Sequence, residues 1–104
     1  MPRTPLETAA LAELKPRLGE LFGGRLERMV LFGSRARGEG HEDSDLDVLV
    51  LVAGVSAAER RAVIDIAFDL ERRFGLAISP LVRDPAKPIG AALAAEIARD
   101  GAPL

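Results

Sequence analysis

The chain has 104 residues, 48% of them hydrophobic and 29% charged, which is typical of a soluble globular protein with one domain over residues 1–104. A formal net charge of −2 argues against direct binding to duplex nucleic acid, which usually needs a strongly basic face. The four phenylalanines, with no Tyr or Trp, are a poor platform for stacking the bases of single strands. There is no cysteine for disulfides or thiolate metal sites, no recognisable signal peptide and no apolar run near the roughly 20 residues that span a membrane, so we expect a cytoplasmic protein.

The first predicted element is a helix that begins at Thr4. A Thr-x-x-Glu capping box occupies residues 4–7, and the paired glycines at residues 23–24 end the helix. Pro16 lacks the N–H that the helical hydrogen-bond ladder needs, so we expect it to kink or split the helix. The apolar residues expected near one face are Leu6, Ala10, Leu14, Leu18 and Leu21.

The rest of the chain alternates strands and helices. Apolar patterning and capping signals predict strands at residues 25–32, 45–52 and 76–83, a short helical turn from Ser34, and helices at residues 56–74 and about 88–100. Pro80 indicates that the third strand lies at a sheet edge or carries a bulge. Parallel pairing of the second and third strands would use the 56–74 helix as the crossover. We therefore expect an α/β (α+β) fold, with a three-stranded mixed sheet covered by helices.

The stretch LFGSRARGEGHEDSDLD, residues 31–47, carries the most information about function. Asp45 and Asp47 are two apart at the start of a strand, so they project to the same face and can bind Mg²⁺ together. Gly33 lets the backbone approach a phosphate closely, and the Ser34 hydroxyl can donate to it. A nucleoside triphosphate with its magnesium is therefore the predicted ligand.

Simpler interpretations apply to each part of this stretch. A Gly-Ser pair alone is most often a turn, and an isolated Asp-x-Asp is commonly turn chemistry. Arg35 and Arg37 are suited to bidentate phosphate contacts, but they could equally be solvated loop residues. His41 lies among charged residues and glycines, so it is read as a loop histidine and not as a catalytic base. The spacing between the two apolar strands favours the combined motif.

Residues 32–47 resemble the signature of the minimal nucleotidyltransferases in the DNA polymerase beta superfamily, Gly-Ser followed after ten residues by Asp-x-Asp. The order of helices and strands is similar to that family over nearly the whole chain, so the resemblance implies a nucleotidyltransferase fold. It further implies that Gly33, Ser34, Arg35, Arg37 and Ser44 bind the nucleotide, and that Asp45 and Asp47 are catalytic and ligate Mg²⁺. The implied reaction transfers AMP from ATP to an acceptor hydroxyl and releases pyrophosphate.

One departure from the family pattern concerns the third strand. Active members usually carry a third carboxylate there, as a metal ligand or as the base for the acceptor hydroxyl. Here the strand holds Ser79 and no acid, and Asp84 comes only after its end. Without general-base help, transfer would be slower by about 10²–10⁴-fold, whereas nucleotide binding would persist.

Four functions follow as hypotheses. The resemblance favours an active adenylyltransferase whose acceptor is a HEPN-type toxin partner, which makes the protein an antitoxin in a homo- or hetero-oligomer. The alternative is a weak or inactive nucleotide-binding subunit that neutralises or regulates a HEPN partner by binding. A drug-modifying nucleotidyltransferase is disfavoured because such enzymes usually need extra acceptor-binding structure. A small α/β domain with a fortuitous motif is the fourth.

Overall fold

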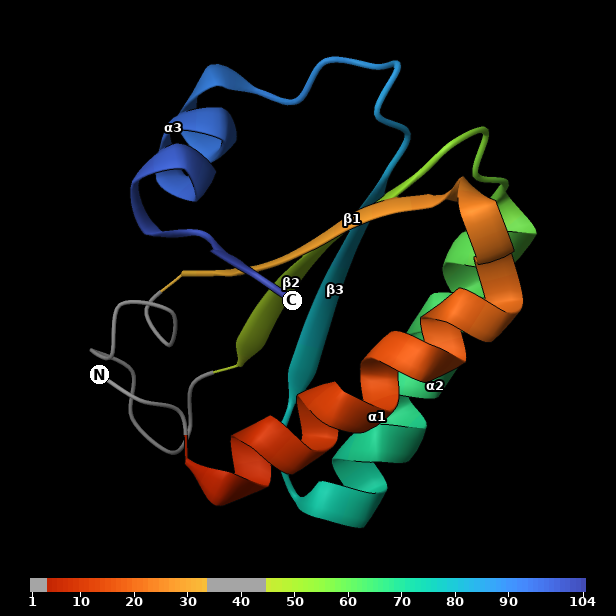
Figure 1. The fold of residues 1–104 in the computed structure, drawn as a ribbon, viewed down its shortest axis with the longest axis vertical. Coiled ribbons are helices and arrows are strands. Elements are labelled where there is room, and N and C mark those ends of the chain that lie inside the picture. The colour runs from red at the N-terminus through yellow and green to blue at the C-terminus, as the bar shows by residue number, and fades with distance from the viewer. Residues whose placement is uncertain (1–3, 34–44) are drawn as a thin grey trace.

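The computed structural model describes residues 4–33 and 45–104. In chain order the elements are α1 (Pro5–Phe22), a 3-10 turn (Gly23–Arg25), β1 (Leu26–Phe32), β2 (Leu46–Val52), α2 (Ala57–Phe74), β3 (Ile78–Arg83), α3 (Ala91–Asp100) and β4 (Ala102–Pro103). In Figure 1, α1 and α2 lie together on one side of the strands, and α3 lies on the other side. Within the described ranges, no helix is long and apolar enough to cross a membrane.

The four strands form one mixed sheet in the order β3-β2-β1-β4. β1 pairs antiparallel with both β2 and β4, whereas β2 pairs parallel with β3 through the α2 crossover, as predicted. Pro80 lies in β3, which is an edge strand, so that prediction is also confirmed. The predicted count of three strands was wrong by one. β4 has only two residues, one of them proline, and is too short to give a periodic signal.

The α1 helix has the predicted capping box. The Thr4 hydroxyl accepts from the Glu7 N–H at 3.1 Å, and the Glu7 carboxylate accepts from the Thr4 N–H at 3.1 Å. The expected split at Pro16 was wrong, because α1 is one helix from Pro5 to Phe22. Fully buried residues on both sides of Pro16 hold it against the sheet: Ala10, Leu14 and Leu18. Leu6 and Leu21, at the margins of the predicted apolar face of α1, are 47% and 38% exposed. The buried face of the helix is therefore narrower than expected.

Two apolar layers separate the sheet from its helices. The larger lies under α1 and α2 and includes the fully buried Leu14, Leu46, Val63 and Leu70. The smaller lies on the opposite face, where Leu93 and Ile97 of α3 pack on a cluster of three buried residues: Val30, Phe32 and Leu49. The face under α3 also carries Asp47, because strand residues two apart share a face.

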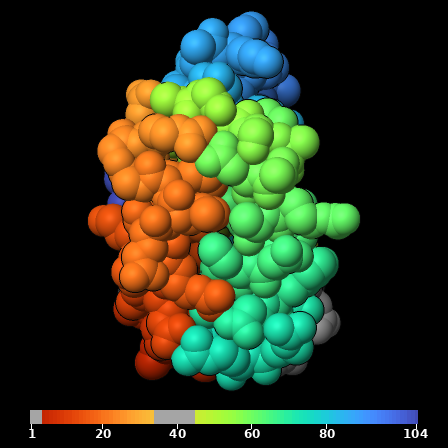
Figure 2. Space-filling model, turned by 90° about the vertical axis from the view of Figure 1, so that its right-hand side faces the viewer, coloured from red at the N-terminus to blue at the C-terminus, as the bar shows by residue number. Residues whose placement is uncertain are grey.

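Ion pairs join α1 to α2. Arg17 pairs with Asp69 at 2.6 Å, and Arg73 donates to both carboxylate oxygens of Glu13. Figure 2 shows the resulting continuous surface, with α1 and α2 side by side along the length of the molecule. Asp69 and Arg73 of α2 therefore face α1 across the helix pair, so the charged side of α2 is not simply a solvated face.

Two element starts also differ from prediction. β3 begins at Ile78 and not at residue 76, and α3 begins at Ala91 and not near residue 88. In α3 the extended residue Gly90 is the N-cap, and its carbonyl accepts the first helical hydrogen bond, from the Ala94 N–H at 3.0 Å. As predicted, α2 stops at Gly75. The backbone φ there is +69°, a conformation that glycine adopts readily.

Candidate functional site

The end of β1 and the start of β2 meet at one end of the two central strands of the sheet. Phe32 and Asp47 are cross-strand partners, which places Gly33 beside the Asp47 side chain. Gly33 has a φ of +80°, and a Cβ built on it would lie 2.4 Å from Oδ2 of Asp47. The carboxylate therefore occupies space that any other residue at position 33 would fill. This close contact explains why a glycine is needed at the turn.

Asp45 and Asp47 lie on either side of Leu46, which is completely buried in the layer under α1 and α2. Since alternate residues of an extended segment point to opposite faces, both carboxylates belong to the other face, as the sequence predicts. Asp45 is exposed and Asp47 is half-buried, so the pair is open to solvent on one side and embedded on the other.

Negative charge is concentrated around Asp47. Burial raises the pKa of its carboxyl above the ordinary value, and the charges of Asp45 and Glu96 raise it further. A carboxylate that is partly removed from water beside two like charges is stabilised by a cation. Asp47 is therefore a natural point for a cation to bind.

The third strand supplies no acid to this site. Ser79 of β3 is the partner of Asp47 in the parallel ladder and lies exposed on the same face. Asp84 follows the far end of β3, roughly 16 Å along the strand from Ser79. Its carboxylate accepts hydrogen bonds there from the N–H groups of Gly54 and Ala86, at 3.2 and 2.9 Å. Asp84 is thus too far from Asp47 to serve as the third acid, as its position after the strand suggested. Its carboxylate oxygens already accept hydrogen bonds from two backbone N–H groups.

The sequence interpretation missed Glu96. This residue belongs to α3, which packs on the same sheet face through Leu93 and Ile97, and its charge acts on Asp47. Its position on an amphipathic helix gave no hint of this, because periodicity shows which residues are buried but not which other element they approach. The other predicted nucleotide-binding residues lie outside the described residues: Ser34, Arg35, Arg37 and Ser44. His41 also lies outside them.

The residues present fit a magnesium ion that shares its ligands with a bound phosphate. Mg²⁺ usually takes one or two carboxylates and completes its shell with waters and phosphate oxygens. Asp45 and Asp47 offer that number of carboxylates, in a cradle that a side chain at Gly33 would fill. No group of three or more potential metal ligands occurs in residues 4–33 and 45–104, so the described chain does not form an all-protein metal cage.

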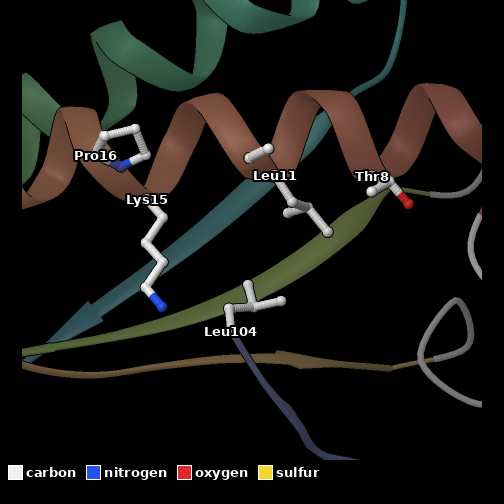
Figure 3. Close-up of a pocket in the computed structure, with 6 residues that line it drawn as sticks. Thr8, Leu11, Lys15, Pro16 and Leu104 are labelled. Atoms are coloured by element: carbon white, nitrogen blue, oxygen red, sulfur yellow. The ribbon is translucent and has the colours of Figure 1, made fainter.

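A cavity away from the carboxylates, shown in Figure 3, lies between α1 and the last residue, Leu104. It has a volume of about 270 Å³, and a mainly apolar lining that contains no carboxylate. Leu104 and Leu11 belong to the layer under α1, so this cavity lies on the sheet face opposite Asp47. It is therefore separate from the carboxylate site.

The mixed sheet and the glycine turn beside Asp47 belong to a nucleotidyltransferase domain. A family model described as "Nucleotidyltransferase domain" matches residues 11–102, and the chain belongs to this family. The predicted membership of the minimal nucleotidyltransferases is confirmed. Among curated proteins, the chain is 36% identical to "Putative protein adenylyltransferase MJ0141" of Methanocaldococcus jannaschii over 73 residues, covering 69% of this chain and 74% of that protein.

Solved structures of the same fold include one described as "Structure of putative minimal nucleotidyltransferase". It is 27% identical with a TM-score of 0.65, and the match covers 100% of both chains. A toxin–antitoxin structure with AMP-PNP has a TM-score of 0.63 at 21% identity, covering 88% of this chain and 69% of that one. A tri-AMPylated HEPN toxin in complex with an MNT antitoxin, from Shewanella oneidensis, has a TM-score of 0.54 at 17% identity, with the same coverage. The nucleotidyltransferase fold is thereby confirmed.

Proposed function

We propose that the protein transfers AMP from ATP to a hydroxyl group of a HEPN-type protein and so acts as its antitoxin. The observation that carries this proposal is the contact between Gly33 and Asp47, beside Asp45 on the same face. Support for the acceptor class comes from the similar complexes, one with AMP-PNP and one with an AMPylated HEPN toxin.

In this proposal Asp45 and Asp47 hold Mg²⁺, and the glycine turn at residue 33 brings the backbone close to the triphosphate. When bound, Mg²⁺ would neutralise phosphate charge and help to orient the triphosphate for in-line attack. Ser34 and Ser44 complete the nucleotide site with hydroxyl groups, and Arg35 and Arg37 with guanidinium groups. A cation at the paired carboxylates also removes the repulsion that raises the pKa of Asp47.

At the α-phosphorus, the reaction forms one bond and breaks one. The acceptor oxygen bonds to the α-phosphorus of ATP while the bond from that phosphorus to the bridging oxygen breaks. Pyrophosphate leaves with that oxygen, and the acceptor hydroxyl loses its proton. The products are the AMP ester of the acceptor, pyrophosphate and one proton, so atoms and charge balance.

A second function is favoured by one observation, which is Ser79 at the strand position that faces Asp47. Without a carboxylate on β3, the protein would bind Mg²⁺ and nucleotide but transfer AMP slowly or not at all. It would then neutralise or regulate its HEPN partner by binding alone, as a subunit of a hetero-oligomer.

The two functions are separated by incubating the protein with α-labelled ATP, Mg²⁺ and a HEPN-domain protein encoded by a neighbouring gene. Label on the HEPN protein that is lost in Asp45→Ala/Asp47→Ala supports transfer. Asp65→Asn, an exposed acid on α2, is the matched control and should transfer normally. Nucleotide binding without transfer, with all metals tested, would leave only the binding function.

Nucleotide binding is tested separately by calorimetry with ATP and Mg²⁺. Asp47→Asn should abolish the Mg²⁺-dependent binding, because the amide keeps the shape of the side chain but cannot offer a second anionic oxygen. Asp65→Asn should bind like the wild type. Equal affinity in Asp47→Asn and the wild type would contradict the metal-binding role assigned to Asp47.

A further inference from the structure

We propose that one exposed side of α2 is the surface through which two copies of this chain pair, with their α2 helices antiparallel. This surface, the α2 stripe, consists of Arg61, Ile64, Phe68 and Glu71. Since α2 covers the sheet face opposite the carboxylates, the inference goes beyond the proposed function and does not rest on it.

The centre of the α2 stripe is apolar and open to solvent. Phe68 is 56% exposed, the highest value among the large hydrophobic residues that the structure describes. The other three phenylalanines are buried or packed against the core: Phe22, Phe32 and Phe74. Ile64, one turn before Phe68, is 38% exposed. Because side chains four apart on a helix lie on the same face, Ile64 and Phe68 form one apolar patch, and covering it stabilises a complex.

The α2 helix has two occupied sides and one exposed side. Val63, Ala67 and Leu70 are buried against the sheet, and Asp69 and Arg73 face α1. At about 100° per residue, the α2 stripe points away from both the sheet and α1, and all four of its residues are exposed. In Figure 2, α2 runs along one margin of the surface that the two helices form. The α2 stripe is therefore accessible to a second molecule.

The two ends of the α2 stripe carry opposite charges. Arg61 lies three residues before Ile64, and Glu71 lies three residues after Phe68. With the described residues, neither of these two charged side chains forms a hydrogen bond or an ion pair. The intervals of three, four and three residues are those of the seam between paired helices, and they are the same in either direction.

This symmetry makes a second copy the occupant and sets the two helices antiparallel. A two-fold axis through the middle of the α2 stripe places Ile64 of one copy against Phe68 of the other, and Arg61 against Glu71. Each contact then occurs twice, and both charge pairs are attractive. Parallel pairing would place Arg61 against Arg61 and Glu71 against Glu71, so like charges would repel. The antiparallel dimer leaves the carboxylate site of each copy uncovered, because α2 lies on the other face of the sheet.

The size of the α2 stripe sets the strength of the pairing. From Arg61 to Glu71 the helix advances by about 15 Å. Such a contact belongs with the small interfaces that bury less than about 1,200 Å² in total and form transient complexes. We therefore expect a reversible dimer whose population rises with protein concentration.

The first test is sedimentation velocity of the full chain from micromolar to millimolar concentration, where the monomer should convert to a dimer. Phe68→Arg should weaken dimerisation by about tenfold or more, because a charge replaces the exposed aromatic ring at the centre of the contact. Leu6→Arg, at a similarly exposed residue of α1, is the matched control and should dimerise like the wild type. Both variants should unfold in urea close to the wild type, since both side chains are exposed.

Charge reversal tests the antiparallel arrangement. Arg61→Glu and Glu71→Arg should each weaken the homodimer by about tenfold, because both symmetry-related pairs then join like charges. An equal mixture of these two variants should form a heterodimer as strong as the wild-type dimer, because each pair again joins opposite charges. The double variant Arg61→Glu/Glu71→Arg should also recover the wild-type strength.

Three results would overturn the inference. The first is a wild type that stays monomeric at millimolar concentration, and the second is a dimer that Phe68→Arg leaves intact. The third is a mixture of the two charge variants that associates no better than either variant alone. If the wild type is monomeric and Phe68→Arg instead abolishes binding to the HEPN protein, the α2 stripe belongs to that partner and the inference fails. AMP transfer is measured separately with labelled ATP, so the proposed function stands or falls independently.

Discussion

Replacing Gly33 by alanine tests the contact on which the site is built. The new Cβ would lie 2.4 Å from Oδ2 and 3.3 Å from Cγ of Asp47, at a φ of +80° that L residues rarely adopt. Two separate costs follow, one in the backbone and one at the carboxylate.

The two costs differ in size and in consequence. A non-glycine residue in the left-handed region costs about 1–2 kcal/mol. The carboxylate is the end of a rotatable side chain, so Asp47 can turn away for about 0.5–1.5 kcal/mol. Gly33→Ala should therefore lower the free energy of unfolding by roughly 1.5–3.5 kcal/mol and leave the protein folded. The functional loss is larger, because a catalytic group displaced by about 1 Å can lower a rate by about 10²-fold.

Gly54→Ala is the matched control. Gly54 also has a positive φ, +62°, but a Cβ there would meet no atom within 4 Å. It should show the backbone cost alone, measured by urea unfolding, and transfer AMP normally. In an Asp47→Ala background the cost of Gly33→Ala should fall to that of Gly54→Ala, since the colliding oxygens are gone.

The reasoning is refuted by a simple result. If Gly33→Ala and Gly54→Ala lose the same stability, and both transfer AMP at the wild-type rate, Asp47 is not held by its contact with residue 33.

Three further predictions concern stability. Hydrogen bonding to Arg25 lowers the pKa of Glu59 from 4.5 to about 2. The stabilisation that the Glu59 carboxylate gives the folded state is therefore complete above pH 4.5 and is lost as the pH falls towards 2. Glu59→Gln should flatten the pH dependence of the free energy of unfolding in urea over that range, whereas Glu71→Gln should not. The pKa of Asp47 is raised by burial and neighbouring charges, so without metal Asp47→Asn should raise the thermal midpoint at pH 7, with the gain vanishing below pH 3.8. A Cβ on Gly101 would lie 2.5 Å from a backbone carbonyl oxygen, so Gly101→Ala should cost about 1–3 kcal/mol by urea unfolding, whereas Gly90→Ala, with open space, should cost less.

Local signals in the sequence were sufficient for most of the fold. The capping boxes at Thr4 and Ser56 and the glycine at position 75 are decided by hydrogen bonds within a few residues, so their positions could be predicted. The exposure of Leu21 and the unbroken helix across Pro16 could not, because both depend on how α1 packs against the sheet and α2. β4 could not be predicted either, because it forms only where the chain turns at Gly101 and pairs with the outer edge of β1.

The candidate site divides in the same way. The shared face of Asp45 and Asp47 follows from strand geometry, which a sequence displays directly. The missing acid on the third strand could also be identified, since the residues of that strand include no Asp or Glu. The pairing of Ser79 with Asp47 is known only from the register of the sheet. Glu96 was missed because it is 49 residues from Asp47 in the chain, and only the tertiary packing of α3 places its helix on the sheet face that carries Asp47.

Pro80 has a consequence for how molecules of this protein meet one another. It lies within β3, at the outer edge of the sheet, and pairs in register with Val48. Since proline has no N–H, that edge lacks a donor near its centre and is a poor template for an added strand. The longest exposed margin of the sheet is thereby protected against pairing with a second copy, which lowers the risk of aggregation at high concentration.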